Sequence, residues 1–259
     1  MRIARLCVLL LCVALAASAD AARPLRLATL NWAPYVAPGL DQQGLSAYII
    51  GSAARQFGRA LEIDYFPWNR ALQLGLHGPG YAGYFPAYYT EQRARECYFS
   101  SPIGTSTLGL AYLKSAPVHW RRLEDLAPFM IGVVAGYSSG AEFDRLVAQQ
   151  KLTIDPSPND TLNLRKLLAG RVQAVVIDRL VMRFLLLAEP DLRKQRRRLA
   201  LSSRPVAELP LYVCFRRTPE GRQLQRKFDA ALQTLPLHAM ENRYFGKLEG
   251  NANAPQADH

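Results

Sequence analysis

Short apolar segments alternate with segments of helical periodicity, and this alternation constrains the fold more than any other feature of the chain. It occurs twice, first over residues 25–76 and again over residues 129–187. Strands that alternate with helices predict a mostly parallel sheet with helices on both faces. Two sets of this size predict an α/β protein with two lobes, and the ligands of such open sheets bind beyond the carboxyl ends of the strands.

The expected elements follow from the apolar spacing and from the Gly and Pro residues between the segments. In the first set we expect strands at 25–31 and 61–66 and helices at 46–57 and 70–76, and between the two sets we expect a strand at 105–113. In the second set we expect strands at 129–135, 152–154 and 172–177 and helices at 140–149, 161–169 and 179–187. A strand at 205–215 and an amphipathic helix at 220–235 follow, and we expect the polar tail 250–259 to be disordered.

The stretch 81–102, YAGYFPAYYTEQRARECYFSSP, lies between the two sets. It begins as an apolar, aromatic run typical of a buried strand, which we expect to break at Pro86. Thr90 is suited to cap a short helix, and Arg93 follows one turn later. A guanidinium fixed beside a strand end can hold a carboxylate, because arginine offers a planar fork of donors. A solvated surface arginine is the alternative interpretation.

Residues 1–19 have the features of a secretory signal peptide. Arg2 and Arg5 precede an apolar run that is too short to span a bilayer, and Ala17-Ser18-Ala19 is a small-residue cleavage site. No later stretch of the sequence is long and apolar enough for a membrane span. We therefore expect a protein that is exported to the periplasm.

Removal of this segment changes the net charge to +11 − 2 = +9 and leaves Cys97 and Cys214 as the cysteines. In an oxidising compartment the two can form a disulfide that contributes roughly 4 kcal/mol, or remain two buried thiols, and the sequence does not decide between them. Two cysteines are too few for a metal framework, and the four histidines show no ligand spacing. We expect neither a metal nor a cofactor.

The basic excess is densest at residues 193–198, RKQRRR, which we expect to form a solvated loop. The aromatic residues lie elsewhere in the sequence, so the interleaved stacking surface of a single-strand binder is missing. We therefore expect no nucleic-acid partner. Attraction to an acidic envelope surface or an acidic partner accounts for the charge more simply.

The order of strand, turn, TEQR at residues 90–93 and YFSSP at residues 98–102 resembles the bacterial extracellular solute-binding proteins of family 3. These are the periplasmic receptors of polar amino-acid uptake systems, and the resemblance covers nearly the whole mature chain. It implies a two-lobed, periplasmic binding protein-like (type II) fold with a hinge and a ligand cleft. The implied boundaries are 20–113 for lobe 1, 114–205 for lobe 2 and 206–249 for the return to lobe 1.

Two groups of candidate ligand-binding residues lie in the first part of the chain. Trp32, Tyr35 and Trp68 follow the first two strands, where rings can stack on an apolar or cationic part of a ligand, although rings at strand ends are also often core residues. Arg70 and Arg93 can hold an anionic group. The resemblance implies that Arg93 binds the ligand carboxylate, whereas for Arg70 a solvated helix face is the stronger interpretation.

The other candidates lie in the second set of elements. Ser138 and Ser139 form part of a turn before a helix, which can cradle an anion or simply cap the helix. Asp178 ends an apolar strand, where it can accept hydrogen bonds from an ammonium or cap the next helix. The resemblance implies that the serines hold the carboxylate of the ligand and that Asp178, in the context Gly170-Arg171-strand-Asp178, binds its α-amino group.

The sequence also departs from the family pattern. Phe85, Pro86 and Tyr88 stand where amino-acid binders commonly carry small hydroxyl residues, so we expect Phe85 and Tyr88 to make the pocket bulkier and more aromatic. The ligand can therefore be an amino acid, another small amine or an organic acid.

The resemblance implies a monomeric, non-catalytic periplasmic protein that captures a small ligand between two lobes and delivers it to an inner-membrane ABC permease or a receptor. The first alternative is a stand-alone sensory protein, whose lobes would look the same in sequence. A second alternative is a dehydratase-like enzyme on the same scaffold, but the carboxylates and histidines form no recognisable catalytic pair.

Overall fold

The computed structural model describes residues 23–253, with side chains described up to residue 246, so the expected signal peptide lies outside the described residues. Ten strands form one sheet in the order β2-β1-β3-β10-β5-β8-β6-β7, with β4 paired to β10 and β9 paired to β5. The α/β fold class expected from the sequence is confirmed. The sheet is mixed rather than mostly parallel, because β5 and β10 pair antiparallel to their neighbours.

The described strands and helices have the following bounds. The strands are β1 (Leu25–Thr29), β2 (Leu61–Tyr65), β3 (Gly83–Tyr88), β4 (Cys97–Phe99), β5 (Gly104–Leu113), β6 (Met130–Val134), β7 (Thr153–Ser157), β8 (Ala174–Asp178), β9 (Leu199–Leu201) and β10 (Ala207–Arg216). The α-helices are α2 (Leu45–Gln56), α3 (Trp68–His77), α4 (Glu91–Glu96), α5 (Ala141–Ala148), α6 (Asp160–Leu168), α7 (Arg179–Ala188), α8 (Pro190–Gln195), α9 (Pro219–Leu232) and α10 (Leu237–Asn253). Short 3-10 helices are η1 (Asp41–Gln43), η2 (Leu123–Leu126) and η3 (Arg196–Arg198).

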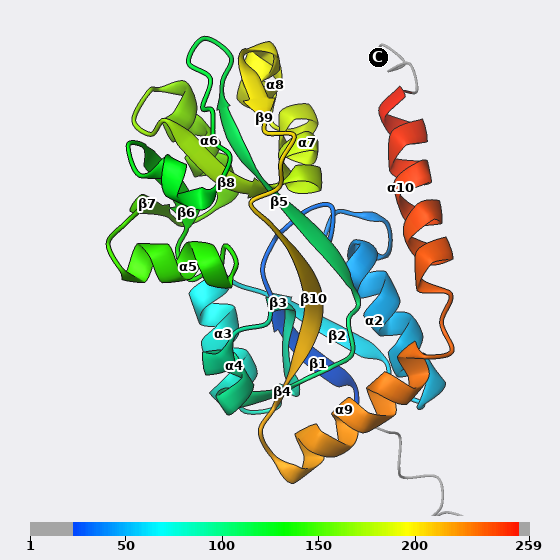
Figure 1. Cartoon of the computed structure of the whole chain (residues 1–259). Coiled ribbons are helices and arrows are strands. Elements are labelled where there is room, and N and C mark those ends of the chain that lie inside the picture. Colours follow the sequence, from blue (N-terminus) through cyan, green and yellow to red (C-terminus); the bar gives the residue numbers. More distant parts are fainter. Residues whose placement is uncertain (1–22, 254–259) are drawn as a thin grey trace, which may run out of the picture.

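The molecule has two lobes (Figure 1). We call β1–β4 with α2, α3, α4, α9 and α10 the first lobe, and β6–β9 with α5–α8 the second lobe. Strands β5 and β10 run between them, and Leu108 of β5 pairs both with Ala207 of β10 and with Asp178 of β8. The two lobes are thus joined by backbone pairing on either side of one residue, which places the functional side chains of both lobes near this crossing.

Strand β3 is the buried centre of the first lobe, and every residue in it is buried. It continues to Tyr88, so the expected break at Pro86 is wrong. Proline has no N–H to donate, and the pairing with β10 shifts register between Tyr212 and Cys214, which leaves Phe85 and Pro86 without ladder partners. A bulge therefore accommodates the proline without ending the strand.

Two further segments differ from the expectations. Residues 193–198 form the end of α8 and the short helix η3, so the expected loop is wrong. Pro190 favours the start of α8, and the acidic first turn and basic last turn of this helix suit the helix dipole. Helix α10 was not expected from the sequence. It reaches Asn253, whereas we expected a disordered tail from residue 250 onward. Residues 254–259 lie outside the described residues. Within residues 23–253, no helix has the length and apolar character needed to cross a membrane.

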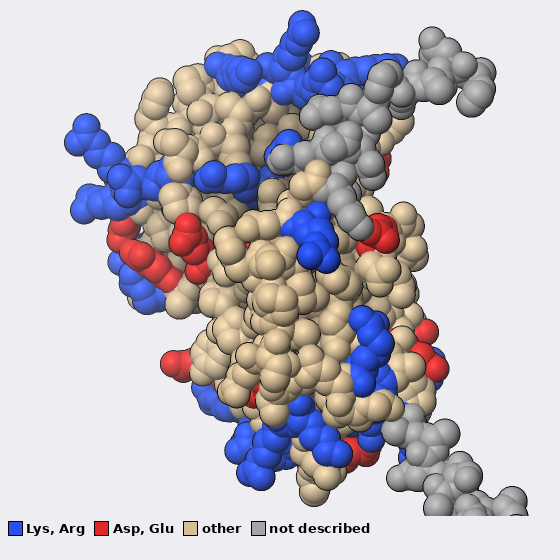
Figure 2. All heavy atoms as spheres, turned by 90° about the vertical axis from the view of Figure 1, so that its right-hand side faces the viewer, with Lys and Arg blue, Asp and Glu red and all other residues tan. Residues whose placement is uncertain are grey.

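Basic side chains gather at the end of the second lobe, where α8 lies, at the top of Figure 2. Residues 193, 194 and 196–198 are all exposed. Neighbouring Lys114 donates its backbone N–H to the carbonyl of Arg198, which brings a further cation to the same end.

Candidate functional site

Four aromatic side chains of the first lobe converge where its strands end. Trp32 and Tyr35 lie in the loop after β1, Trp68 begins α3, and Tyr88 ends β3; all four are buried. Trp32 stacks on Tyr35 with ring centroids 4.5 Å apart, and its ring meets that of Tyr88 edge to face at 6.2 Å. Such pairs are stabilised beyond their burial, so the rings hold each other in place.

Tyr137 brings the second lobe into this aromatic cluster. It follows β6, and its ring packs edge to face against Trp32 at 6.4 Å and against Trp68 at 5.7 Å. Its burial raises the pKa of the Tyr137 hydroxyl well above the usual value. The side chain thus packs against both tryptophans and links the lobes through ring contacts.

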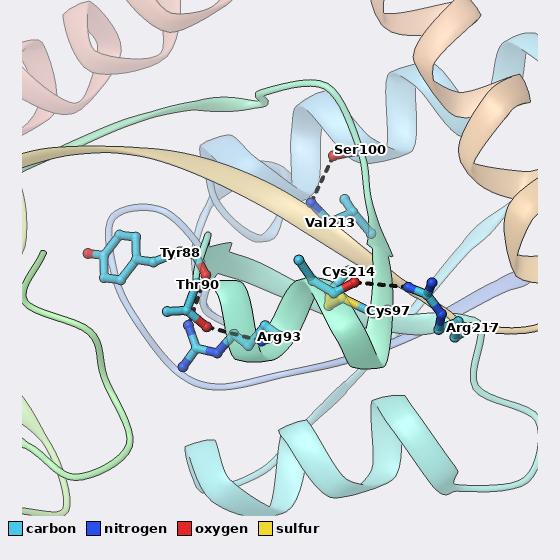
Figure 3. Close-up of a disulfide and its surroundings, with 9 residues drawn as sticks. Tyr88, Thr90, Arg93, Cys97, Ser100, Val213, Cys214 and Arg217 are labelled. Carbon is cyan, nitrogen blue, oxygen red and sulfur yellow. Dashed lines mark hydrogen bonds between the residues drawn. A yellow bond between two sulfur atoms is a disulfide. The ribbon is translucent and has the colours of Figure 1, made fainter. Parts of the chain in front are cut away.

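Arg93 is held on a short helix that is fixed at both ends (Figure 3). Thr90 caps α4, as expected, by accepting the backbone N–H of Arg93 at 3.1 Å. At the other end Cys97 forms a disulfide with Cys214 of β10, so the paired alternative is the one observed. The Arg217 guanidinium also donates to the Ala94 carbonyl at 2.9 Å. These three attachments fix the orientation of α4.

The Arg93 guanidinium binds two backbone carbonyls. Nη1 donates to the Tyr88 carbonyl at 2.9 Å, and Nη2 donates to the Gly136 carbonyl of the second lobe at 2.8 Å. The guanidinium carbon also lies 5.7 Å from the centre of the Trp68 ring. In this conformation Arg93 connects the lobes, and part of its donor fork is engaged by protein oxygen atoms.

Gly136 makes close contacts with the first lobe beside Arg93. Its carbonyl accepts a second hydrogen bond, from Trp68 Nε1 at 3.1 Å. Its φ of +80° is in the left-handed region, and a Cβ at this position would lie 2.3 Å from Asn69 Oδ1. The backbone conformation favours glycine, and a larger residue would also displace the end of the Asn69 side chain.

Asp178 is 2 % exposed, and its two carboxylate oxygens accept four hydrogen bonds. Oδ1 caps α7 by accepting from the backbone N–H groups of Leu180 and Val181, at 2.7 and 2.9 Å. Oδ2 accepts from Ser106 Oγ at 2.7 Å and from the Tyr35 hydroxyl at 3.1 Å. Burial raises the pKa of Asp178, while these hydrogen bonds oppose the rise. The structure therefore shows the helix cap that was one of the two interpretations of this residue.

The serine turn is occupied by a carboxylate of its own lobe. Asp144 accepts from Ser138 Oγ at 2.5 Å and from the backbone N–H of Ser139 at 2.9 Å. The backbone N–H of Gly140 donates to Ser138 Oγ at 3.3 Å. Asp144 thus takes donors that were expected to serve a ligand carboxylate.

Asp160 is a second buried carboxyl at this interface, at the first position of α6 and 7 % exposed. The Trp32 indole of the first lobe lies beside it and favours its ionised form. Burial, with a contribution from the nearby charge of Asp178, raises the pKa of Asp160 to about 7. Near neutral pH a small change in surroundings therefore changes its charge.

Three spaces adjoin these residues. Two are small: a cavity of about 20 Å³ beside Arg93, Trp68 and Tyr137, and one of about 10 Å³ beside Asp160 and Asp178. Each has room for about one water molecule. A larger pocket of about 540 Å³ opens between the lobes over Trp32, Trp68, Tyr137 and Asp160. That volume suits a small ligand.

The structure brings together most of the residues expected to bind a ligand. Those that line these three spaces are Trp32, Trp68, Tyr88, Arg93, Ser138, Ser139 and Asp178, and Tyr35 contacts Trp32 and Asp178. Phe85 is instead fully buried within β3, and Arg70 is an exposed residue whose guanidinium lies 5.9 Å from the Phe66 ring centre. Neither side chain lines the three spaces, because the pleat turns Phe85 into the core and α3 turns Arg70 outward.

Sequence reasoning missed Ser106, Tyr137 and Asp160. Tyr137 lies inside the glycine- and serine-containing turn whose hydroxyls drew attention, and a large ring between two glycines was the signal that could have found it. Asp160 follows Asn159, the residue that caps α6, so it resembles an ordinary first-turn carboxylate. Only the approach of Trp32 from the other lobe distinguishes it.

No protein-family model matches the chain, and no curated protein matches it. Solved structures do. A histidine kinase sensor domain with similarity to periplasmic binding proteins has a TM-score of 0.74 at 18 % identity, covering 88 % of this chain and 98 % of its own. A mutant of ArgBP from T. maritima has a TM-score of 0.70 at 18 % identity, and the match covers 86 % of this chain and 96 % of that one.

A third similar structure is an ancestral amino acid-binding protein described as a precursor of cyclohexadienyl dehydratase. Its TM-score is 0.68 at 17 % identity, and the match covers 87 % of this chain and 95 % of that one. At these identities the likeness concerns the fold. The chain has the two-lobed fold of periplasmic binding proteins. This is the fold that the resemblance in the sequence implied.

Proposed function

We propose that this protein binds a small polar solute between its two lobes. One observation carries the proposal: the pocket of about 540 Å³ is lined from both lobes, with Trp32 and Trp68 on one side and Tyr137 and Asp160 on the other. A ligand that contacts both lobes favours the conformation in which they are close together. An amino acid or a related amine is the proposed class, in line with the proteins of similar fold.

We propose that the protein acts in the periplasm as a monomer and presents its closed form to a membrane partner. The partner is an ABC permease in a transport role or a receptor in a sensory role. The similar structures include a histidine kinase sensor domain, which is a precedent for a sensory role on this fold, and an ArgBP. Cross-linking in membranes of the native host, followed by mass spectrometry of the captured protein, separates a permease from a receptor.

The proposal is tested by a thermal-shift screen of the protein purified after export to the periplasm of an expression host. The probes are amino acids, polyamines and small organic acids. A ligand that binds only the folded state raises the melting temperature by mass action, by an amount that grows with its concentration. Trp32→Ala should remove the shift, whereas substitution of Trp120, which lies away from the pocket, should preserve it. No shift with any probe would contradict solute binding.

An enzyme on this scaffold is the second candidate, and Asp160 is the observation that favours it. A carboxyl group with a pKa of about 7 in a cleft is suited to general acid or base catalysis. One of the similar structures is also described as a precursor of a dehydratase. Mass spectrometry of each stabilising ligand after incubation tests this candidate, because a binding protein returns its ligand chemically unchanged.

A further inference from the structure

The charge that lines the pocket between the lobes is opposite to the charge of the protein. The chain carries a formal net charge of +11. Among the described residues that line the pocket of about 540 Å³, the charged ones are Asp160 and Glu189, and no Lys or Arg is among them. This pocket is therefore a local acidic site on a basic protein, where field lines from the two carboxylates attract a cation.

Six of the other fifteen lining residues are aromatic. They are Trp32, Tyr65, Phe66, Trp68, Tyr137 and Phe184. The face of such a ring attracts an organic cation, most strongly when the site is partly shielded from water. Rings from both lobes with carboxylates beside them form a site for an ammonium or guanidinium group attached to an apolar part.

Asp160 is suited to pair with this cation. Burial and the nearby charge of Asp178 disfavour ionisation of its carboxyl group, and the Trp32 indole opposes them only in part. A ligand cation would reverse that effect by stabilising the carboxylate. Glu189 lies at the rim of the pocket, where Arg165 forms ion pairs with both Glu189 and Asp191. Arg165 Nη2 is 3.3 Å from Glu189 Oε2, and Arg165 Nε is 2.8 Å from Asp191 Oδ2.

The groups that would bind the two ends of an α-amino acid are engaged elsewhere. Arg93 donates to the carbonyls of Tyr88 and Gly136. Asp178 accepts four hydrogen bonds from its own surroundings. The pocket over Asp160 thus offers acceptors and rings, with no free guanidinium for a carboxylate.

We infer that the ligand of the inter-lobe pocket is an organic cation, an amine or guanidinium compound, whose charge pairs with Asp160 and whose apolar part contacts Trp32, Trp68 and Tyr137. This inference rests on the proposed solute-binding function and specifies its ligand class. A carboxylate on the ligand has no lining Lys or Arg to pair with in this site. Selection is by positive charge and apolar contact, and it differs from the two-ended clamp of Arg93 and Asp178.

The test is isothermal titration calorimetry at pH 8, where Asp160 is mostly ionised. The probes are spermidine, agmatine and choline as cations, arginine and glutamine as amino acids, and glutamate and succinate as anions. The expected result is binding of at least one cation and no binding of glutamine, glutamate or succinate. Agmatine, which lacks the carboxylate of arginine, should bind at least as tightly as arginine.

Three variants assign the binding to the pocket. Asp160→Asn should weaken cation binding at least about tenfold, and Glu189→Gln, at the exposed rim, about two- to fivefold. Glu142→Gln is the matched control, since Glu142 is also a first-turn carboxylate of a second-lobe helix but is exposed. It should leave the affinity unchanged. Glu189→Gln keeps the inference testable if Asp160→Asn folds poorly.

Two results would overturn the inference in distinguishable ways. If glutamine or glutamate binds, and Arg93→Ala abolishes that binding while Asp160→Asn does not, the ligand class is wrong and solute binding itself stands. If no probe binds to the parent protein at any tested concentration, the ligand class and the proposed function fail together.

Discussion

The buried carboxyl of Asp160 should make the stability of the protein depend on pH in a way that one substitution removes. Its pKa is about 7 in the folded protein, against an ordinary value of 3.8. The folded state therefore binds more protons than the unfolded state between these values, and the free energy of unfolding falls as the pH rises through this window. The groups that face Asp160 are Asp178, Tyr88 and Tyr137, and none of them carries a positive charge.

The magnitude follows from the two pKa values. Between pH 5.5 and pH 8 the folded carboxyl loses its proton, whereas the unfolded one is already ionised, which lowers the free energy of unfolding by about 2 kcal/mol. In Asp160→Asn this contribution is absent. The stability difference between variant and parent should therefore shift by about 2 kcal/mol in favour of the variant over this interval. For a domain of this size, that corresponds to a melting-temperature difference of about 4–8 °C.

Urea unfolding of parent and variant at pH 5.5, 6.5, 7.2 and 8 measures this difference directly. The comparison cancels the contributions of carboxyl groups that do not interact with Asp160. Asp178 does interact with it, so the measured difference includes the change that Asp160→Asn makes to the titration of Asp178. Glu142→Gln should follow the parent, since this carboxylate is exposed. Parallel curves for parent and Asp160→Asn across the whole interval would show that Asp160 titrates normally, and the reasoning about its burial would be refuted.

Three further perturbations test the geometry around the site. Gly136→Ala should lower the free energy of unfolding by more than Gly170→Ala, because both glycines have a positive φ but a Cβ at Gly136 would also displace the end of the Asn69 side chain. Gly170→Ala, with no described atom within 4 Å of its Cβ, should cost about 1 kcal/mol, and equal losses in the two variants would contradict the close contact at Gly136. Replacing Cys97 and Cys214 by serine removes a disulfide that joins residues 117 positions apart and so gives the unfolded chain more freedom. The free energy of unfolding should fall by about 4–5 kcal/mol, and a change below about 1 kcal/mol would contradict the disulfide. Thr90→Ala should lower it by about 1 kcal/mol through loss of the α4 cap, with Thr90→Ser as the control that retains most of it.

The fold was predictable to the extent that it depends on local periodicity. The apolar spacing located the helix at 46–57, observed as α2 (Leu45–Gln56), and the strand at 61–66, observed as β2 (Leu61–Tyr65). Pairing direction was not predictable from it. Which neighbours β5 and β10 meet depends on contacts between residues about a hundred positions apart, such as Leu108 with Ala207, and a local pattern carries no information about them.

The candidate site was predictable by position but less so by role. Trp32, Trp68 and Arg93 lie at the interface of the lobes because they follow strand ends, which the sequence indicated. Their partners came from elsewhere in the sequence: the Gly136 carbonyl accepts hydrogen bonds from Arg93 and Trp68 across the lobes, and Asp160 lies beside Trp32. Such pairs form only when the two lobes close on each other, so no spacing in the sequence could reveal them.

The central claim is that a solute binds between the lobes, and hydrogen-exchange mass spectrometry with and without a stabilising ligand tests it most directly. We expect reduced exchange in segments of both lobes, at 31–37 and 66–70 in the first and at 136–140 and 158–163 in the second. These segments surround the pocket between the lobes. Protection confined to one lobe would contradict the claim, as would protection around the separate pocket of about 520 Å³ beside Arg59 and Arg216.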